Sequence, residues 1–125
     1  MWVFYNPNPS GNLVGDCVIR AISAVMNQDW ETTYLDLLSQ GYILKDMPSA
    51  NWVWGTYLYN HGFRSHTISE YTKRKYTVKD FVKDCPECTG ILAIGTHAVA
   101  IKDGNYYDSW DSGDEVPIYY WKKEV

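Results

Sequence analysis

Residues 95–110 read GTHAVAIKDGNYYDSW, and this stretch decides the fold that we expect. Asp103-Gly104 is a turn signal, because both residue types accept the positive φ angles that two-residue β-turns require. Apolar and strand-forming residues flank the turn on both sides, which is typical of two antiparallel strands. A two-residue turn places Lys102 opposite Asn105 and thereby fixes the register of every pair further out.

The predicted register brings a histidine and an aspartate together. Counting from the turn, Val99 lies opposite Asp108. Two residues further along the same face, His97 lies opposite Trp110. His97 and Asp108 are therefore diagonal neighbours within hydrogen-bonding reach. A carboxylate beside an imidazole fixes the ring tautomer, as a general base requires. The hairpin alone nevertheless favours a buried histidine that is satisfied by a nearby acid.

The rest of the chain has helical periodicity before the hairpin and one more strand after it. Asp16, Asp29 and Thr77 are expected N-caps, and Gly41 and Gly62 are expected helix stops. The first fifteen residues are rich in turn formers and are expected to form an extended lead-in. Helices are predicted at 16–27, 29–41, 48–62 and 77–85, and strands at 63–68, 91–101, 105–110 and 118–121. This order predicts an α+β fold, with N-terminal helices packed on a C-terminal antiparallel sheet.

Length and composition limit the classes of protein that fit. The 125 residues are 46% apolar and carry a formal net charge of −4. This length predicts one domain over residues 1–125, and the apolar content excludes a disordered chain. The acidic balance argues against nucleic acid as a partner, and no apolar run is long enough to cross a membrane. The N-terminus lacks the pattern of a signal peptide and three cysteines do not make a disulfide framework, so we expect a cytoplasmic protein.

Cys17 stands in the first turn of the helix predicted at 16–27. A thiol there lies near free backbone amides and the positive end of the helix dipole, and both favour the reactive thiolate. The commoner role of a lone cysteine is that of a small buried hydrophobe. Together with His97 and Asp108, Cys17 completes a set of nucleophile, base and orienting acid. The sequence therefore predicts a catalytic triad of these three residues.

The chain resembles the papain-like cysteine peptidases in the order and setting of these residues. Residues 15–22, GDCVIRAI, look like the family's nucleophile segment, and residues 95–101, GTHAVAI, look like its histidine strand. Asp108-Ser109-Trp110 is similar to the family's Asn-Ser-Trp motif, in which the tryptophan shields the third catalytic residue from water. The likeness is greatest to compact members, such as bacteriocin-leader peptidase domains and small phage-encoded relatives, which use aspartate as the third residue.

This resemblance implies a minimal papain-like fold and a thiol hydrolase that cleaves an amide or isopeptide bond in a peptide or protein. It implies that Cys17 attacks, that His97 transfers the proton and that Asp108 orients His97. It gives Trp110 the shielding role and requires no cofactor.

The oxyanion donor is where the sequence departs from the family. The family places a glutamine six residues before the nucleophile, where this chain has Gly11. Asn12 is the nearest side-chain amide and Asn8 is a second candidate, but each is one methylene shorter than glutamine. The backbone amide of Cys17 supplies one donor by itself. Val18 is a further departure, because many relatives have glycine or serine there.

Other functions are open on the same residues. The triad does not separate hydrolysis from transfer to an amine, so a transglutaminase- or amidase-type acyl transferase is an alternative. A non-catalytic binding or inhibitor module is a second alternative, because a missing oxyanion donor costs about a hundred- to a thousandfold in rate. A purely structural protein, with the order of the three residues a coincidence, is a third. Residues 42–48 and 70–76 are the expected walls of a substrate groove.

Cys85 and Cys88 have the spacing of half a zinc site. Nothing supplies the second ligand pair, because Cys17 is assigned elsewhere and His61 and His66 lack the spacing of a partner motif. We therefore expect no metal, and a solvent-facing turn that carries two incidental thiols able to oxidise.

Overall fold

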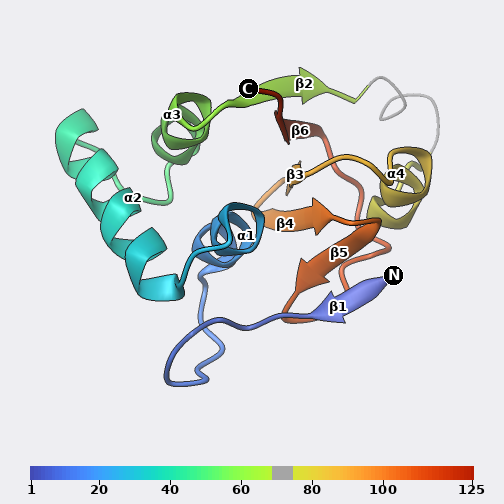
Figure 1. Cartoon of the computed structure of the whole chain (residues 1–125), viewed down its shortest axis with the longest axis horizontal. Helices are drawn as coiled ribbons and strands as arrows, with labels where there is room; N and C mark the ends of the chain where they lie inside the picture. The colour runs from blue at the N-terminus through green and yellow to red at the C-terminus, as the bar shows by residue number, and fades with distance from the viewer. Residues whose placement is uncertain (69–74) are drawn as a thin grey trace.

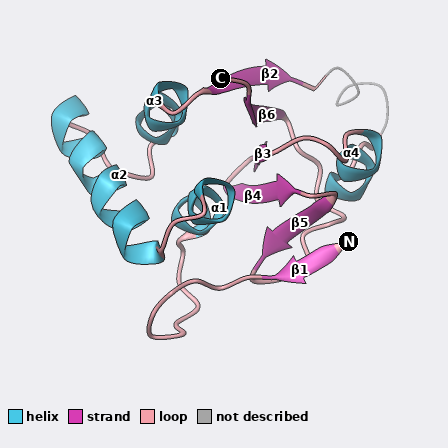
Figure 2. Ribbon diagram, in the orientation of Figure 1, coloured by secondary structure: helices cyan, strands magenta, loops and turns pink. Residues whose placement is uncertain are grey.

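The computed structural model describes residues 1–68 and 75–125. In that part of the chain it has four helices and six strands, and the predicted α+β class is confirmed (Figures 1 and 2). The elements in chain order are β1 (Trp2–Phe4), α1 (Cys17–Met26), α2 (Trp30–Leu44), α3 (Asn51–Asn60), β2 (Phe63–Thr67), α4 (Val78–Asp84), β3 (Gly90–Ile94), β4 (His97–Lys102), β5 (Asn105–Asp108) and β6 (Tyr119–Lys123).

The six strands form one sheet in the order β1-β5-β4-β3-β6-β2. Four of the five neighbouring pairs are antiparallel, as expected. The exception is β1, which comes from the predicted lead-in and pairs in parallel with β5, so the sheet is mixed. The single strand predicted at 91–101 is two strands, because the chain reverses between Ile94 and His97, which lie opposite each other.

The predicted hairpin is confirmed in register next to its turn, but β5 ends at Asp108, two residues before the predicted end at Trp110, and the pairing with β4 reaches Ala100 opposite Tyr107. Lys102 pairs with Asn105, and the next pair out is Ile101 with Tyr106. The turn residues have φ angles of 54° at Asp103 and 75° at the following glycine, which is the left-handed conformation that a two-residue turn requires. The local signal in residues 95–110 was therefore sufficient to place this part of the sheet.

Both faces of the sheet carry apolar cores. Ala98 and Ala100 of β4 belong to the core under α1, α2 and α3, while Val99 and Ile101 belong to a second core with α4. This division follows from the alternation of side chains along a strand. The two alanines are small, and α1 lies directly on β4 (Figure 1). The start of α1 is thereby brought to the end of the sheet where β4 begins.

The helix α2 is longer than predicted. We expected Gly41 to end it, but it continues to Leu44. The buried residues are Thr33, Leu37 and Gly41, which are four apart and share one face. A β-carbon on Gly41 would lie 2.6 Å from a backbone carbonyl oxygen in the turn after the helix, so this glycine serves close packing.

Two predicted features are only partly covered by the described residues. Of the expected groove wall at 70–76, residues 70–74 lie outside the described part, and Tyr76 is buried in the core beside α4. The opposite wall, at 42–48, contributes Met47 and Pro48 to a cavity beside Cys17. Across residues 1–68 and 75–125, every helix is too short or too polar to span a bilayer.

Candidate active site

Cys17 is the first residue of α1, as predicted, but the end of the helix is built differently. Asp16 holds the N-cap position without capping, because its carboxylate makes no bond to the first-turn amides. Instead it accepts hydrogen bonds from Arg20 (2.5 Å) and from the indole of Trp30 (2.8 Å). Arg20 brings a full positive charge to the carboxylate in a buried setting, which a backbone amide does not, and this explains why Arg20 competes successfully. The amides beside Cys17 are consequently left without a side-chain cap.

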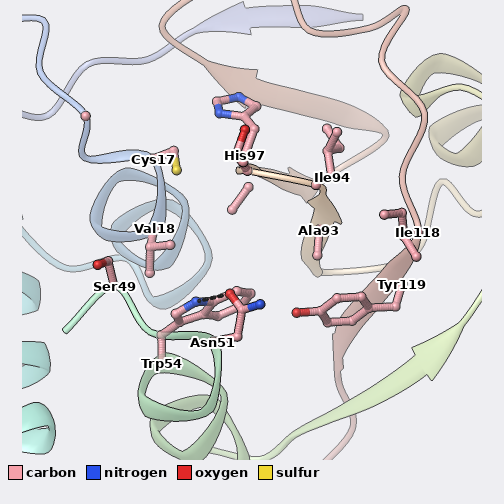
Figure 3. A pocket seen from close by; sticks show the side chains of 14 residues that line it. Cys17, Val18, Ser49, Asn51, Trp54, Ala93, Ile94, His97, Ile118 and Tyr119 are labelled. Carbon is pink, nitrogen blue, oxygen red and sulfur yellow. Dashed lines mark hydrogen bonds between the residues drawn. The ribbon is translucent and has the colours of Figure 1, made fainter. Parts of the chain in front are cut away.

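His97 is the first residue of β4 and makes the predicted bond to Asp108. Its Nε2 lies 2.6 Å from Oδ2 of Asp108, so the expected hydrogen bond is confirmed. Because Nε2 is engaged, the nitrogen left for the thiol is Nδ1. Cys17 and His97 face each other at one end of a pocket, with the sulfur on α1 and the ring on β4 (Figure 3).

Asp108 is fully buried, and its carboxylate accepts four hydrogen bonds. One oxygen accepts from Arg20 (2.9 Å) and the Ser109 amide (2.8 Å), and the other accepts from His97 and the Ser112 hydroxyl (2.7 Å). A carboxylate has about four lone-pair sites, so no site is left for a proton. Burial raises the pKa of Asp108, but the bonds from His97 and Ser112 and the charges of His97 and Arg20 outweigh burial and lower it. The aspartate is therefore ionised and fixes the proton of His97 on Nε2.

The surroundings of the thiol and the imidazole favour charge on both. Burial opposes ionisation of Cys17. Hydrogen bonds from His97 and from the Ala98 backbone, together with the positive charges of His97 and Arg20, outweigh burial and hold the pKa of the thiol below its usual value. Burial likewise opposes the charge on His97, yet hydrogen bonds to Asp108 and Cys17 and their negative charges raise its pKa to about 9. The arrangement therefore favours a thiolate beside an imidazolium at neutral pH.

Trp110 packs on the histidine of this group. Its ring centroid lies 5.1 Å from that of His97, with 35° between the ring planes. The indole is 45% exposed, so part of it meets solvent while it contacts the imidazole. Asp108 is itself fully buried, and the contact that the structure gives for Trp110 is with His97.

Three cavities share Cys17 in the described part of the chain. The first, of about 360 Å³, runs between α1, α3 and the β3–β4 turn, with Val18, Asn51 and Trp54 in its wall (Figure 3). The second, of about 280 Å³, is mostly apolar and lies between α1 and residues 47–49. The third, of about 430 Å³, lies on the side of His97 and Trp110. A chain molecule could therefore extend from Cys17 in more than one direction.

The predicted side-chain oxyanion donors are not in these cavities. Asn12 is exposed, its carbonyl accepts a bond from Asn6, and it lines none of the three cavities. Asn8 likewise lines none of them, and its side chain accepts from the Ser10 amide. The backbone amide of Cys17 is thus the donor that the structure places at the site.

Cys85 and Cys88 form a disulfide at the end of α4. The expectation that both residues are free thiols is therefore wrong. The disulfide agrees with the expectation that these thiols can oxidise. Glu87 lies with them in a group of potential metal ligands, but sulfurs joined to each other are not thiolate ligands. Cys17 is the one free cysteine of the three.

The comparisons with known proteins add no relative. The chain matches no protein-family model, no curated protein and no solved structure. The inference about function therefore depends on the geometry of the site.

Sequence reasoning missed two partners of the triad, Arg20 and Ser112. Arg20 had a signal, because it is a charged residue four positions after Asp16 in an otherwise apolar helical segment. Ser112 had none, because the segment after β5 has no pattern that predicts a return to Asp108.

Proposed function

We propose that this protein is a thiol hydrolase of the papain-like kind, in which Cys17, His97 and Asp108 cleave an amide or isopeptide bond. One observation carries the proposal: a free thiol at a helix start and an imidazole face each other, and the imidazole is bonded to a saturated, buried carboxylate. The three groups come from α1, β4 and β5, so the fold itself assembles them. Nucleophile, base and orienting acid are the set that acyl transfer requires.

In the proposed mechanism each group has one role. The Cys17 thiolate attacks the substrate carbonyl carbon, and the negative oxygen of the tetrahedral intermediate accepts a hydrogen bond from the Cys17 amide. The bond to the amine then breaks, and His97 gives the leaving nitrogen its proton. A water molecule attacks the resulting thioester with His97 as base. The acid is released, the thiolate and imidazolium are regenerated, and Asp108 keeps Nε2 of His97 protonated throughout.

A peptide or protein chain is the substrate that the surroundings of Cys17 fit best. The cavities leave Cys17 on different sides, which suits a substrate that continues beyond the reacting bond in both directions. The mostly apolar cavity beside Met47 and Pro48 suits an aliphatic side chain.

The direct test is the rate at which iodoacetamide alkylates Cys17 at about pH 6, followed by mass spectrometry. An ordinary thiol with a pKa of about 8.5 is less than about 1% ionised at that pH, so it reacts slowly. We expect rapid alkylation of Cys17, and none at this position in the Cys17→Ser variant. Alkylation at the rate of an ordinary thiol would contradict the proposal and support a non-catalytic binding module. Peptide digestion with and without an added amine then separates hydrolysis from transfer.

A further inference from the structure

Arg20 is a buried cation that joins the helix of the nucleophile to the orienting acid. Its guanidinium lies between two carboxylates, with Nη1 2.5 Å from Asp16 and Nη2 2.9 Å from Asp108. The side chain of Arg20 is 5% exposed, and both carboxylates are buried with it. The indole of Trp30, at the start of α2, donates to the other oxygen of Asp16. Each oxygen of Asp16 therefore has a donor, and the network spans α1, α2 and β5.

The position of Arg20 along the chain links it to Cys17. The two residues are three apart, so they lie on neighbouring positions of one helical face. The same turn of α1 therefore carries both the nucleophile and the counter-ion of Asp108. Since His97 is also bonded to Asp108, a shift of α1 against the hairpin would stretch the Arg20–Asp108 bond and move the sulfur away from the ring.

We infer that Arg20 is the positioning residue of this site: it docks the nucleophile helix onto Asp108 and keeps that aspartate charged and aimed at His97. The inference rests on the proposed function, which it deepens by naming how the triad is held. A buried carboxylate with a neutral partner in place of arginine would be costly to keep ionised. A neutral, protonated Asp108 would no longer hold the proton of His97 on Nε2, so the base would lose its orientation.

The charges in this part of the molecule alternate. Asp16 and Asp108 are negative on either side of Arg20, and the imidazolium of His97 follows Asp108. The thiolate of Cys17 completes the series beyond His97. These five are the charged and titratable groups that the structure brings into contact along this path from α1, β4 and β5. Removal of the positive charge of Arg20 leaves the buried carboxylates of Asp16 and Asp108 facing each other. Removal of Asp16 does not.

The test compares Arg20→Gln, Arg20→Lys and Asp16→Asn with the unmodified protein. Glutamine keeps a donor for Asp108 without the charge, and lysine keeps the charge without the fork of two N–H groups. The rate of Cys17 alkylation by iodoacetamide is measured between about pH 4 and about pH 10, with urea unfolding alongside. We expect Arg20→Gln to shift the acid limb of the rate profile to higher pH by about one pH unit. Alkylation at a given acid pH is then about tenfold slower. Arg20→Lys should restore most of that shift.

Asp16→Asn is the matched control for a purely structural role. It breaks the other half of the same buried network, so it should lower the free energy of unfolding without moving the acid limb upward. If Arg20→Gln lowers stability and leaves the limb where it is, Arg20 is only a structural anchor and the inference is wrong. Should Arg20→Gln fail to fold, the double variant Asp16→Asn with Arg20→Gln replaces it, because it removes one of the two facing carboxylates.

A second readout separates this inference from the proposed function. NMR titration of the His97 ring, in a Cys17→Ser background, reports on Asp108 without requiring a reactive thiol. Arg20→Gln should change this titration in that background even if the unmodified protein alkylates like an ordinary thiol. An unchanged titration there overturns the role of Arg20, while an ordinary thiol profile in the unmodified protein overturns the proposed function.

Discussion

The start of α1 and the end of α4 each hold cysteine, and the two places give it opposite chemistry. Cys17 opens α1, where the helix dipole is positive and the ring of His97 faces the sulfur. Cys85 follows the last residue of α4, where the dipole is negative, and Cys88 is close enough to form a disulfide with it. The first setting favours a free thiolate and the second removes the thiol from reaction. The surroundings of the sulfur decide its chemistry.

The difference can be traced to the partner that each sulfur has. Cys17 has no second cysteine near it and has an imidazole that is itself held by Asp108. The pair at α4 has a second sulfur and, among the described residues, no histidine that the structure places in contact with it. If this comparison is correct, reactivity at Cys17 should depend strongly on Asp108, less on Trp110, and not at all on the disulfide.

The largest effect is expected from Asp108→Asn. The change removes the charge that holds the proton on His97, so the imidazolium and the thiolate both lose their stabilisation. The pKa of the Cys17 thiol should then rise toward its ordinary value, and each unit of that rise slows alkylation about tenfold at acid pH. We expect alkylation of Cys17 at about pH 6 to slow by more than about tenfold. Ser112→Ala is the control, because it removes one of the four donors to the carboxylate and leaves the charge. Equal rates in the Asp108→Asn variant and the unmodified protein would contradict the ion pair.

A smaller effect, a shift of about one unit, is expected in the titration of His97 when Cys17 is changed to serine. In the unmodified protein the ring should lose its proton at about pH 9, because the thiolate and Asp108 stabilise the positive charge. Hydrolysis should therefore fall as the pH rises through that value, since a neutral His97 has no proton for the leaving amine. In Cys17→Ser the midpoint should move down but stay above the ordinary value, because Asp108 is still present. The ring is followed by NMR, and an unmoved midpoint would mean that the thiol is not ionised.

A still smaller effect is expected from Trp110→Ala. The indole covers one side of His97 and is itself half exposed, so its removal lets water screen the ion pair. The acid limb of the profile of Cys17 alkylation rate against pH should shift to higher pH by less than about one pH unit. The free energy of unfolding should fall by about 1 kcal/mol. Trp52→Ala is the matched control, because Trp52 is similarly exposed and bonds to Asp46 on the helical side of the molecule. A shift of the same size in both variants would remove the specific role of Trp110.

The parts of the site that were predicted from sequence are those fixed by local chemistry. Asp103-Gly104 sets its own turn geometry, and the alternation of a strand then carries that register out to His97 and Asp108. Cys17 was placed at a helix start by an apolar period of 3.6 and an acidic residue before it. In each case residues within a short segment determine the outcome.

The parts that were missed depend on how distant segments pack. The cap rule predicted that Asp16 would bind the amides of its own helix. In the packed structure Arg20 and Trp30 donate to its carboxylate instead. The parallel pairing of β1 with β5 joins residues more than a hundred positions apart, and no local pattern encodes it. The approach of Ser112 to Asp108 depends on the path of a loop.

The double variant Cys85→Ser with Cys88→Ser removes the disulfide at α4, and we expect no effect of this change on the reactivity of Cys17. The disulfide closes a loop of only four residues, so its loss should cost about 2 kcal/mol of stability by chain entropy. Neither sulfur is a partner of Cys17 or His97, so the alkylation profile of Cys17 should be unchanged while urea unfolding occurs at lower denaturant. If the profile moved with the stability, the reactivity of Cys17 would reflect general loosening of the fold. An unchanged profile on a less stable protein would place its origin in the contacts with His97 and Asp108.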